Sequence, residues 1–455
     1  MGLKTKFNRV EKMSQNQTPF TVKDILRTEV APALGCTEPI AIALAASAAA
    51  ALVKGAPIES IEIWVDPNIY KNGIAVVIPG TQGHNGLDLA AALGALGGVP
   101  EMRLQVLESI DDRVVGQARA LVNDKKVQVN LLHDRRGLFI KAVVRADDRL
   151  AECTIRDMHD NIVSLKLDGE EIREHPLKPI PTGPDGKTEL QQVETWLKSL
   201  SLARLIELLD DLDEEDLEFI EEGVQHNLRL ADYGLKHGSG LGIGKTLDRL
   251  VRQRMLTQDM GLAARALTAA ASDARMDGVK LPAMSSAGSG NHGLTATLPI
   301  WAVKDYVECE RRTVLEAIGL SHIITAHVKA HTGRLSAVCG CSIAAGAGAT
   351  AGITYLLGGD PHHIAGAITN LTEDLAGVIC DGAKAGCSLK LATAAGTAVQ
   401  AALFSLQGVY VKATDGIISS SPEKTMENVG ILSSQGMIET DRTILKIMLE
   451  KQFSI

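Results

Sequence analysis

The sequence predicts an α+β N-terminal domain followed by a mostly α-helical domain rich in alanine and glycine. Residues 58–66 and 125–166 contain short runs in which apolar and polar residues alternate, as in strands. From residue 188 onward, apolar residues recur at helical spacing. Between these regions, residues 176–187 carry four prolines and two glycines, which is typical of a linker.

The first elements of the chain follow from local patterns. Residues 1–20 are polar and lack periodicity, so we expect a disordered extension. The α+β domain then spans residues 21–175. Its first helical region, residues 21–53, is interrupted at APALGCTEP, and Pro39 suits the first turn of the helix that resumes there.

A strand, a loop and a second strand are expected next. Residues 58–66 read as the first strand, PNIYKNG at 67–73 as the loop, and IAVVIPG at 74–80 as the second strand. A helix follows at residues 85–97. Further strand-like runs at residues 103–107 and 125–166 complete the domain.

The helical domain is expected to span residues 188–455. It begins with helices that have acidic faces and continues as alanine-rich helices separated by glycine-containing turns. Aromatic residues make up only 3% of the chain, so its core must be built from Ala, Val, Ile and Leu. Residues 340–359 are uncharged, but they are mostly Ala and Gly, so we expect a helix buried in a soluble protein rather than a membrane span.

Charge and composition limit the partners. The net charge is −9 and no basic block with interleaved aromatic residues occurs, which argues against nucleic acid. A few placed cations, rather than a general positive field, would have to meet an anionic substrate. The polar N-terminal segment lacks the apolar core of a signal peptide, which favours the cytoplasm. Large Ala/Gly helical surfaces make a homodimer the expected assembly.

Cysteines carry the clearest chemical signal. The chain has seven, an odd number in a large protein, which argues against a disulfide framework. Cys339, Cys380 and Cys387 lie in Ala/Gly-rich surroundings where close packing needs no thiol. Thiolates hold iron–sulfur clusters, and three on a four-iron cube would leave one iron for a substrate. Zinc and inert burial remain alternatives, although zinc sites usually show tight CxxC pairs.

Two other cysteines need separate treatment. Cys341 lies two residues after Cys339, and on a helix their side chains would point to different sides, so we expect only one of the two to be a ligand. Cys36 lies at the break between two helices, where a helix N-terminus would stabilise its thiolate. It is a candidate fourth iron ligand or base.

Several polar loop residues are candidates for substrate binding. The loop PAMSSAGSGNHG at 282–293 would offer hydroxyl and backbone N–H groups to a carboxylate, unless it is an ordinary turn-rich connection. Its candidate residues are Ser285, Ser286, Ser289 and Asn291. Near the N-terminal strands, Lys71, Asn72 and Thr81 are a cation, an amide and a hydroxyl in loops, and Lys384 lies between two of the cysteines.

One glycine-rich motif points to a different ligand. SGLGIGKT at 239–246 nearly matches a phosphate-binding loop. However, Ser239 replaces the first required glycine, and no suitable strand precedes the motif. We therefore interpret it as a glycine-rich junction between helices.

Taken together, the motifs resemble those of the L-cysteine desulfidase family, whose members are also described as serine dehydratase-like. The resemblance covers the chain from about residue 21. The segments that carry it are GCTEP at 35–39, PNIYKNG at 67–73, PGT at 79–81, ALGALGG at 92–98, SDARMDG at 272–278, LPAMSSAGSGNHGLTAT at 281–297, RLSAVC at 334–339 and ICDGAKAGC at 379–387.

This resemblance implies a [4Fe–4S] enzyme that converts L-cysteine to pyruvate, ammonia and sulfide. Its two domains would be similar to those of iron–sulfur L-serine dehydratases. The family's cluster cysteines fall on Cys339, Cys380 and Cys387, and its N-terminal cysteine falls on Cys36. Glu38 is then expected at the substrate, with Cys36, Lys71 and Lys384 as catalytic groups.

Two alternatives to L-cysteine desulfidase stay open at this point. One is an L-serine dehydratase or a related amino-acid β-eliminating lyase, and the other is a non-catalytic iron–sulfur redox sensor. Pyridoxal phosphate is not expected, because the sequence offers no convincing lysine motif for it.

Overall fold

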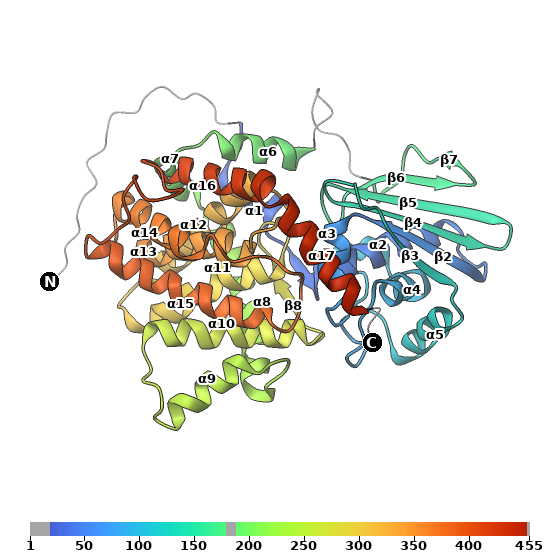
Figure 1. The fold of residues 1–455 in the computed structure, drawn as a ribbon, viewed down its shortest axis with the longest axis horizontal. Helices are drawn as coiled ribbons and strands as arrows, with labels where there is room; N and C mark the ends of the chain where they lie inside the picture. The colour runs from blue at the N-terminus through green and yellow to red at the C-terminus, as the bar shows by residue number, and fades with distance from the viewer. Residues whose placement is uncertain (1–18, 179–187, 453–455) are drawn as a thin grey trace.

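The two largest hydrophobic cores of the described residues lie one in an α+β half and one in a helical half (Figure 1). The structure is a computed structural model that describes residues 19–178 and 188–452. The predicted disordered extension, apart from its last two residues, and most of the predicted linker lie outside the described residues. The mixed α+β class is confirmed.

A single mixed sheet forms the α+β half. Its strand order is β3-β2-β4-β5-β6-β7, with β2 and β3 parallel and the other neighbours antiparallel. The strands are β2 (Ile58–Val65), β3 (Val127–Leu131), β4 (Phe139–Ala146), β5 (Arg149–Arg156), β6 (Ile162–Leu167) and β7 (Glu170–Glu171). The helices are α2 (Thr37–Leu52), α3 (Pro67–Gly73), α4 (Leu87–Gly97), the 3-10 turn η1 (Pro100–Gln105) and α5 (Asp112–Asn123).

Helix α2 is the centre of this half because small residues let its neighbours approach. It is buried along almost its whole length and packs between the sheet and α4. A Cβ at Gly94 of α4 would lie 2.1 Å from the carbonyl oxygen of Ala43 of α2. Only glycine permits this contact, which fixes α2 and therefore the residues at its N-terminus.

The helical half wraps around the long buried helix α12 (Arg311–Thr332). Its other elements are α6 (Glu189–Lys198), α7 (Leu202–Glu207), η2 (Leu208–Asp211), α8 (Glu214–His237), α9 (Ile243–Arg252), α10 (Met260–Met276), β8 (Pro282–Met284), α11 (Gly290–Val303), η3 (Lys304–Tyr306), the π-turn η4 (Cys341–Ala345), α13 (Gly346–Leu356), α14 (Pro361–Leu375), α15 (Cys387–Leu406), α16 (Pro422–Ile431), the π-turn η5 (Leu432–Gly436) and α17 (Ile438–Gln452).

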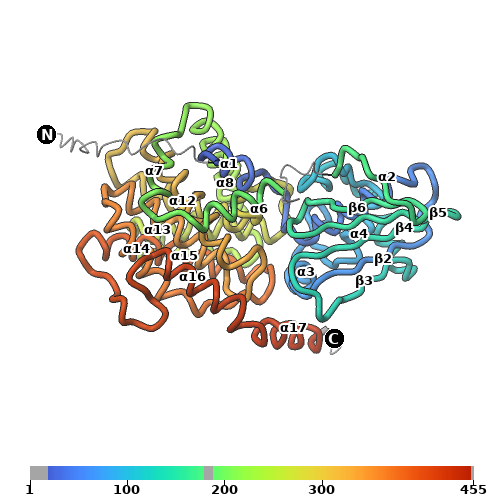
Figure 2. Tube along the Cα trace, turned by 90° about the horizontal axis from the view of Figure 1, so that it is seen from above, coloured from blue at the N-terminus to red at the C-terminus, as the bar shows by residue number. Residues whose placement is uncertain are grey.

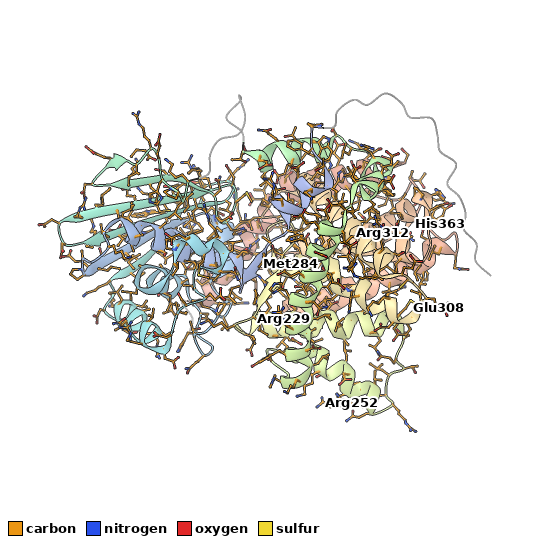
Figure 3. All side chains as sticks on the ribbon, turned by 180° about the vertical axis from the view of Figure 1, so that it is seen from behind. Arg229, Arg252, Met284, Glu308, Arg312 and His363 are labelled. Carbon is orange, nitrogen blue, oxygen red and sulfur yellow. The ribbon has the colours of Figure 1, made fainter. Side chains whose placement is uncertain are left out.

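The first and the last described helices each connect the two halves. Helix α1 (Val22–Glu29), which the sequence assigned to the α+β unit, packs its apolar face in the core of the helical half. Strand β1 (Pro32–Leu34) then pairs antiparallel with β8, where Met284 lies (Figure 3). At the other end, α17 leaves the helical half and lies along the α+β half (Figure 2). These crossings hold the two halves against one another.

Three local predictions in the α+β half are wrong. PNIYKNG is the helix α3, because Asp66 accepts hydrogen bonds from two amides of its first turn and Pro67 occupies the first helical position. Residues 74–80 form a turn-rich segment rather than a strand, and residues 103–107 include the end of η1. These apolar residues are buried without pairing in the sheet, so their pattern resembled that of strands.

The uncharged segment at residues 340–359 contains η4 and the whole of α13, both of which are largely buried inside the helical half. Among the described residues, one helix, α15, is long and apolar enough by composition to cross a membrane, and 61% of its apolar window is buried inside the protein.

Candidate active site

A cavity of about 90 Å³ lies where the two halves meet. The α+β half contributes residues from the N-terminus of α2, from α3 and from the loop between β5 and β6. The helical half contributes α10, α12 and the loops that carry the cysteines. The chemically active residues on its wall are Cys36, Glu38, Asn72, His159, Arg275, Ser289, Asn291, His292, Lys329, Arg334, Cys339, Cys341, Cys380, Cys387 and Lys390.

Backbone pairing brings the predicted cluster cysteines together. The amide of Cys339 donates to the carbonyl of Val378 at 2.8 Å, and the amide of Cys380 donates to the carbonyl of Ala337 at 2.7 Å. Two loops far apart in sequence therefore run antiparallel and place these cysteines beside each other. Cys387 begins α15, and all three thiols face the same cavity.

Gly382 lets the second cysteine loop pass close to α3. Its φ is +90°, and a Cβ there would lie 2.4 Å from the carbonyl oxygen of Lys71. Lys384 closes the same loop, because its ammonium pairs with Asp381 at 2.5 Å and donates to the carbonyl of Gly382. Lys384 thus orders the segment between Cys380 and Cys387 but does not line the cavity.

Cys341 also faces the cavity, contrary to the prediction that it and Cys339 point to different sides. The reason is local, because Cys339 precedes the helix and Cys341 begins the wider turn η4. A hydrogen bond from the Cys341 thiol lowers the pKa of Cys339 against the effect of burial. Gly340 between them leaves room for the ring of His292, since a Cβ would lie 2.4 Å from its Nε2.

These thiols are suitable ligands for an iron–sulfur cluster. Burial raises the pKa of Cys380, and it raises that of Cys387 to about 11, so without a metal both thiols stay protonated. Among residues 19–178 and 188–452, no three His, Cys, Asp or Glu side chains converge on a single ion. The cysteines instead surround a cavity, an arrangement that suits a multi-iron cluster.

Cys36 and Glu38 form a hydrogen-bonded pair on the opposite wall. The Cys36 thiol donates to Oε2 of Glu38 at 2.9 Å, and the amide of Asn72 donates to Oε1 at 3.2 Å. Nε2 of His159 lies 3.8 Å from the same Oε1. Burial opposes ionisation of Glu38, but the nearby His159 ring and the hydrogen bond from Cys36 outweigh it and lower its pKa to about 2.

The electrostatics of Cys36 differ from the prediction. We expected its position before a helix to stabilise the thiolate. Cys36 is the N-cap of α2, but burial and the adjacent Glu38 carboxylate raise its pKa well above the usual range. The positive charge of Arg275 acts in the opposite direction and does not reverse this effect. In the absence of ligand, the proton stays on sulfur.

The remaining predicted residues divide into two groups. Asn72, Ser289 and Asn291 line the cavity together with Cys36 and Glu38. Thr81, Ser285 and Ser286 do not, because their hydroxyls bond elsewhere: Thr81 to the carbonyls of Ile78 and His84, Ser285 to the carbonyl of Ala31, and Ser286 to Nδ1 of His322. They support the loops around the site.

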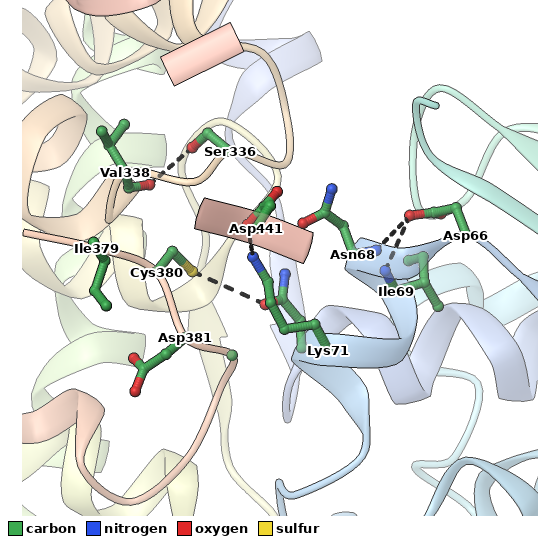
Figure 4. A network of polar contacts seen from close by, with 12 residues as sticks. Asp66, Asn68, Ile69, Lys71, Ser336, Val338, Ile379, Cys380, Asp381 and Asp441 are labelled. Carbon is green, nitrogen blue, oxygen red and sulfur yellow. Dashed lines mark hydrogen bonds and ion pairs between the residues drawn. The ribbon is translucent and has the colours of Figure 1, made fainter. Parts of the chain in front are cut away.

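Lys71 is buried, but it faces a second cavity. Its ammonium lies 2.6 Å from Oδ1 of Asp441 on α17 (Figure 4). That cavity, of about 690 Å³, lies beneath α17 at the junction of the halves. The thiol of Cys380 is directed at Asn72, next to Lys71, with 3.9 Å between its sulfur and Oδ1 of Asn72. Lys71 therefore connects the C-terminal helix to the cysteine loops.

Sequence reasoning missed several residues on the cavity wall, among them His159, Arg275 and Lys329. His159 follows a strand and carried no motif. Arg275 lies within SDARMDG, where its charge next to a buried alanine run was the available signal. Lys329 is the one Lys or Arg in the apolar stretch from Val314 to Ala330, which was an equally visible signal.

The phosphate-loop-like motif is a helix junction, as interpreted from the sequence. The amide of Gly244, in the first turn of α9, donates to Oδ2 of Asp273 on α10 at 3.0 Å. A carboxylate of the protein thus already occupies that helix N-terminus. Helix α9, with Arg252 at its outer end (Figure 3), projects away from the α+β half.

Comparison with known proteins identifies the family to which this chain belongs. The family model for the serine dehydratase alpha chain matches residues 135–446, which include Cys339, Cys380 and Cys387. The chain belongs to the serine dehydratase alpha chain family. It is 64% identical to a UPF0597 protein of Desulfatibacillum aliphaticivorans, over 96% of this chain and 99% of that protein.

Other relatives of this serine dehydratase alpha chain family member are also full-length matches. A UPF0597 protein of Desulfotalea psychrophila is 61% identical over 95% of this chain and 99% of its own length. A UPF0597 protein of Clostridioides difficile is 42% identical over 93% of this chain and 98% of its own length. The similarity therefore covers both halves and the cavity between them.

Proposed function

We propose that the protein is an L-cysteine desulfidase, which eliminates sulfide from L-cysteine to give pyruvate and ammonia. One observation carries the proposal: three cysteines of the helical half share a cavity with Cys36, Glu38 and Asn72 of the other half. Membership of the serine dehydratase alpha chain family supports lyase chemistry on a small amino acid.

Cys339, Cys380 and Cys387 would hold a [4Fe–4S] cluster, which would act as a Lewis acid on the leaving group. Iron suits a sulfur leaving group, because thiolate is a soft ligand. Elimination breaks the Cα–H and Cβ–S bonds, and the aminoacrylate then takes up water to yield pyruvate and ammonia.

Residues on the opposite wall of the cavity would bind the amino acid and accept its α-proton. Glu38 is ionised and buried, so it is suited to receive the α-ammonium. Its carboxylate is one cause of the raised pKa of Cys36. Pairing with a substrate ammonium would remove part of that effect and favour loss of the thiol proton. Cys36 Sγ would then be the acceptor of the α-proton.

The test is anaerobic reconstitution with iron and sulfide, followed by assay of sulfide and pyruvate from L-cysteine without added pyridoxal phosphate. We expect equal amounts of sulfide and pyruvate. A protein that forms the cluster but catalyses elimination with neither L-cysteine nor L-serine would contradict the proposal. Cys36→Ser is expected to keep the cluster and lose at least about 100-fold in kcat, the usual contribution of a general base.

A second candidate function is L-serine dehydratase, favoured by the name of the matching family. The ratio of kcat/KM for L-cysteine to that for L-serine decides between the two. A third candidate function is a redox sensor. The position of Cys341 favours it, because this thiol lines the cavity near Cys339 and could be a fourth protein ligand. A sensor would show no spectral change when L-cysteine is added.

A further inference from the structure

Two cations on the cavity wall have no counter-ion among the described residues. Arg334 is paired with Glu29 and Glu194, and Lys390 is paired with Asp381. Arg275 and Lys329 are each only 2% exposed, and neither forms an ion pair within residues 19–178 and 188–452. A buried charge without a partner is costly, so this excess of positive charge calls for an anion.

Arg275 is the more constrained of the two. It lies in the last turn of α10, and one terminal nitrogen donates to the carbonyl of Gly35, just before Cys36. Its Nε is buried and has no hydrogen-bond partner in the described structure. Gly290 faces the guanidinium, and a Cβ there would lie 2.4 Å from Nε. The missing side chain lets the backbone at Gly290 pack close to Nε, so the guanidinium lines the cavity together with Ser289 and Asn291.

Lys329 and Arg275 differ in whether they can lose their positive charge. Burial lowers the pKa of Lys329 to about 8, so this lysine has the option of losing its charge. Electrostatic interactions with Cys380, Cys341 and Cys339 oppose that shift, so Lys329 lies close to the cysteines. An arginine does not deprotonate in proteins, so Arg275 needs an anion at every physiological pH.

The surroundings of Arg275 identify the kind of anion. Its neighbours on the cavity wall are Cys36 and His292, which are both neutral without ligand. Within the described part of the chain, Glu38 is the only carboxylate lining the cavity, and it is already bonded to Cys36 and Asn72 and close to His159. A planar guanidinium that lines the cavity and forms no ion pair in the described structure matches a carboxylate supplied from outside.

We propose that Arg275 binds the α-carboxylate of the substrate, opposite the α-ammonium held by Glu38. This assignment rests on the proposed amino-acid lyase function and deepens it, because it makes the site selective for zwitterionic α-amino acids. The sequence analysis offered the loop at residues 282–293 for the carboxylate and Lys71 as a cation near the substrate. Arg275 replaces Lys71 in this role, while Ser289 and Asn291 remain beside it.

Equilibrium binding tests the assignment without turnover. Isothermal titration calorimetry of the reconstituted protein would use L-alanine, which lacks a β leaving group, and ethylamine, which also lacks the carboxylate. The wild type is expected to bind L-alanine and to prefer it over ethylamine. Arg275→Met is expected to lose at least about 30-fold in affinity for L-alanine and to keep its affinity for ethylamine.

Controls separate binding from folding. Arg265→Met removes an exposed arginine from the same helix, and its affinity for L-alanine should equal that of the wild type. Ligand-free Arg275→Met should unfold at a urea midpoint close to that of the wild type, because removal of an unpaired buried charge offsets the lost hydrogen bond to Gly35. A structural arginine would instead give a clear fall in that midpoint with unchanged affinity, which would overturn the assignment.

Arg275→Lys covers the case in which the methionine variant does not fold. It keeps the charge but lacks the planar fork, so we expect KM for L-cysteine to rise at least about tenfold, with a smaller change in kcat. Unchanged KM, or a wild type that does not bind L-alanine, would refute the assignment. Normal L-alanine binding through Arg275 in a protein that eliminates nothing would instead refute the lyase proposal alone.

Discussion

The charge of Glu38 is predicted to stabilise the folded protein. The structure surrounds its carboxylate with the Cys36 thiol at 2.9 Å, the Asn72 amide at 3.2 Å and His159 at 3.8 Å. The pKa is lowered from 4.5 to about 2. At about 1.4 kcal/mol per pKa unit, this shift corresponds to about 3 kcal/mol of folding free energy at neutral pH.

Glu38→Gln keeps the shape of the side chain and removes the charge. We expect it to lower the free energy of unfolding of the ligand-free protein by about 3 kcal/mol at pH 7. The folded-state pKa is depressed, so the contribution is complete above the unfolded pKa and is lost as pH falls toward the folded one. The deficit should hold between pH 7 and pH 5 and shrink to less than half by pH 3.

Urea unfolding of the wild type and of Glu38→Gln at pH 7, 5, 4 and 3 measures this difference. Thr37→Val is a control at the neighbouring position, where a hydroxyl donates to the same carboxylate at 3.3 Å without carrying charge. Its deficit should be at most about 1.5 kcal/mol. Equal stability of Glu38→Gln and the wild type at pH 7, or a deficit that is unchanged at pH 3, would refute the reasoning.

Three further predictions concern the cysteine loops and their support. Cys380→Ala should abolish the charge-transfer absorption of the reconstituted protein, whereas Cys341→Ala should retain it; a full spectrum in the first variant would remove Cys380 from the ligand set. Gly382→Ala should lower the unfolding free energy by about 1–3 kcal/mol, because its φ is +90° and its Cβ would meet the backbone of α3. Gly377→Ala, with open space around it, should cost under about 1 kcal/mol, and equal losses would contradict the strain argument. Asp441→Asn should cost about 3 kcal/mol in urea unfolding by leaving the buried lysine of α3 unpaired, and a loss below about 1 kcal/mol would mean that α17 is not held by this pair.

Much of the fold could be predicted from local patterns. The period-2 runs at residues 125–166 became β3 to β6, because one face of that sheet is buried against α2. The break at APALGCTEP was visible because Gly35 and Pro39 interrupt the helical pattern. By contrast, α1 carries a helical pattern that does not specify which core it joins, so its packing on the helical half was missed.

The sequence predicted the site residues whose side-chain type indicates their chemistry, such as cysteine. It missed those whose role depends on the tertiary structure. Cys36, Cys339, Cys380 and Cys387 share the cavity as the motifs implied. Lys71 was predicted to face the substrate because it was placed in an exposed loop, whereas the Asp66 cap makes that segment a helix and directs Lys71 to Asp441. The cluster itself, the substrate and the homodimer stay predictions.

Mössbauer spectroscopy of the reconstituted protein with and without L-cysteine tests the central claim most directly. Three thiolates at the junction of the halves should leave a single iron site open to the substrate. The account predicts that L-cysteine changes the parameters of one iron site and leaves the others as they were. Four equivalent irons that do not respond to L-cysteine would contradict it.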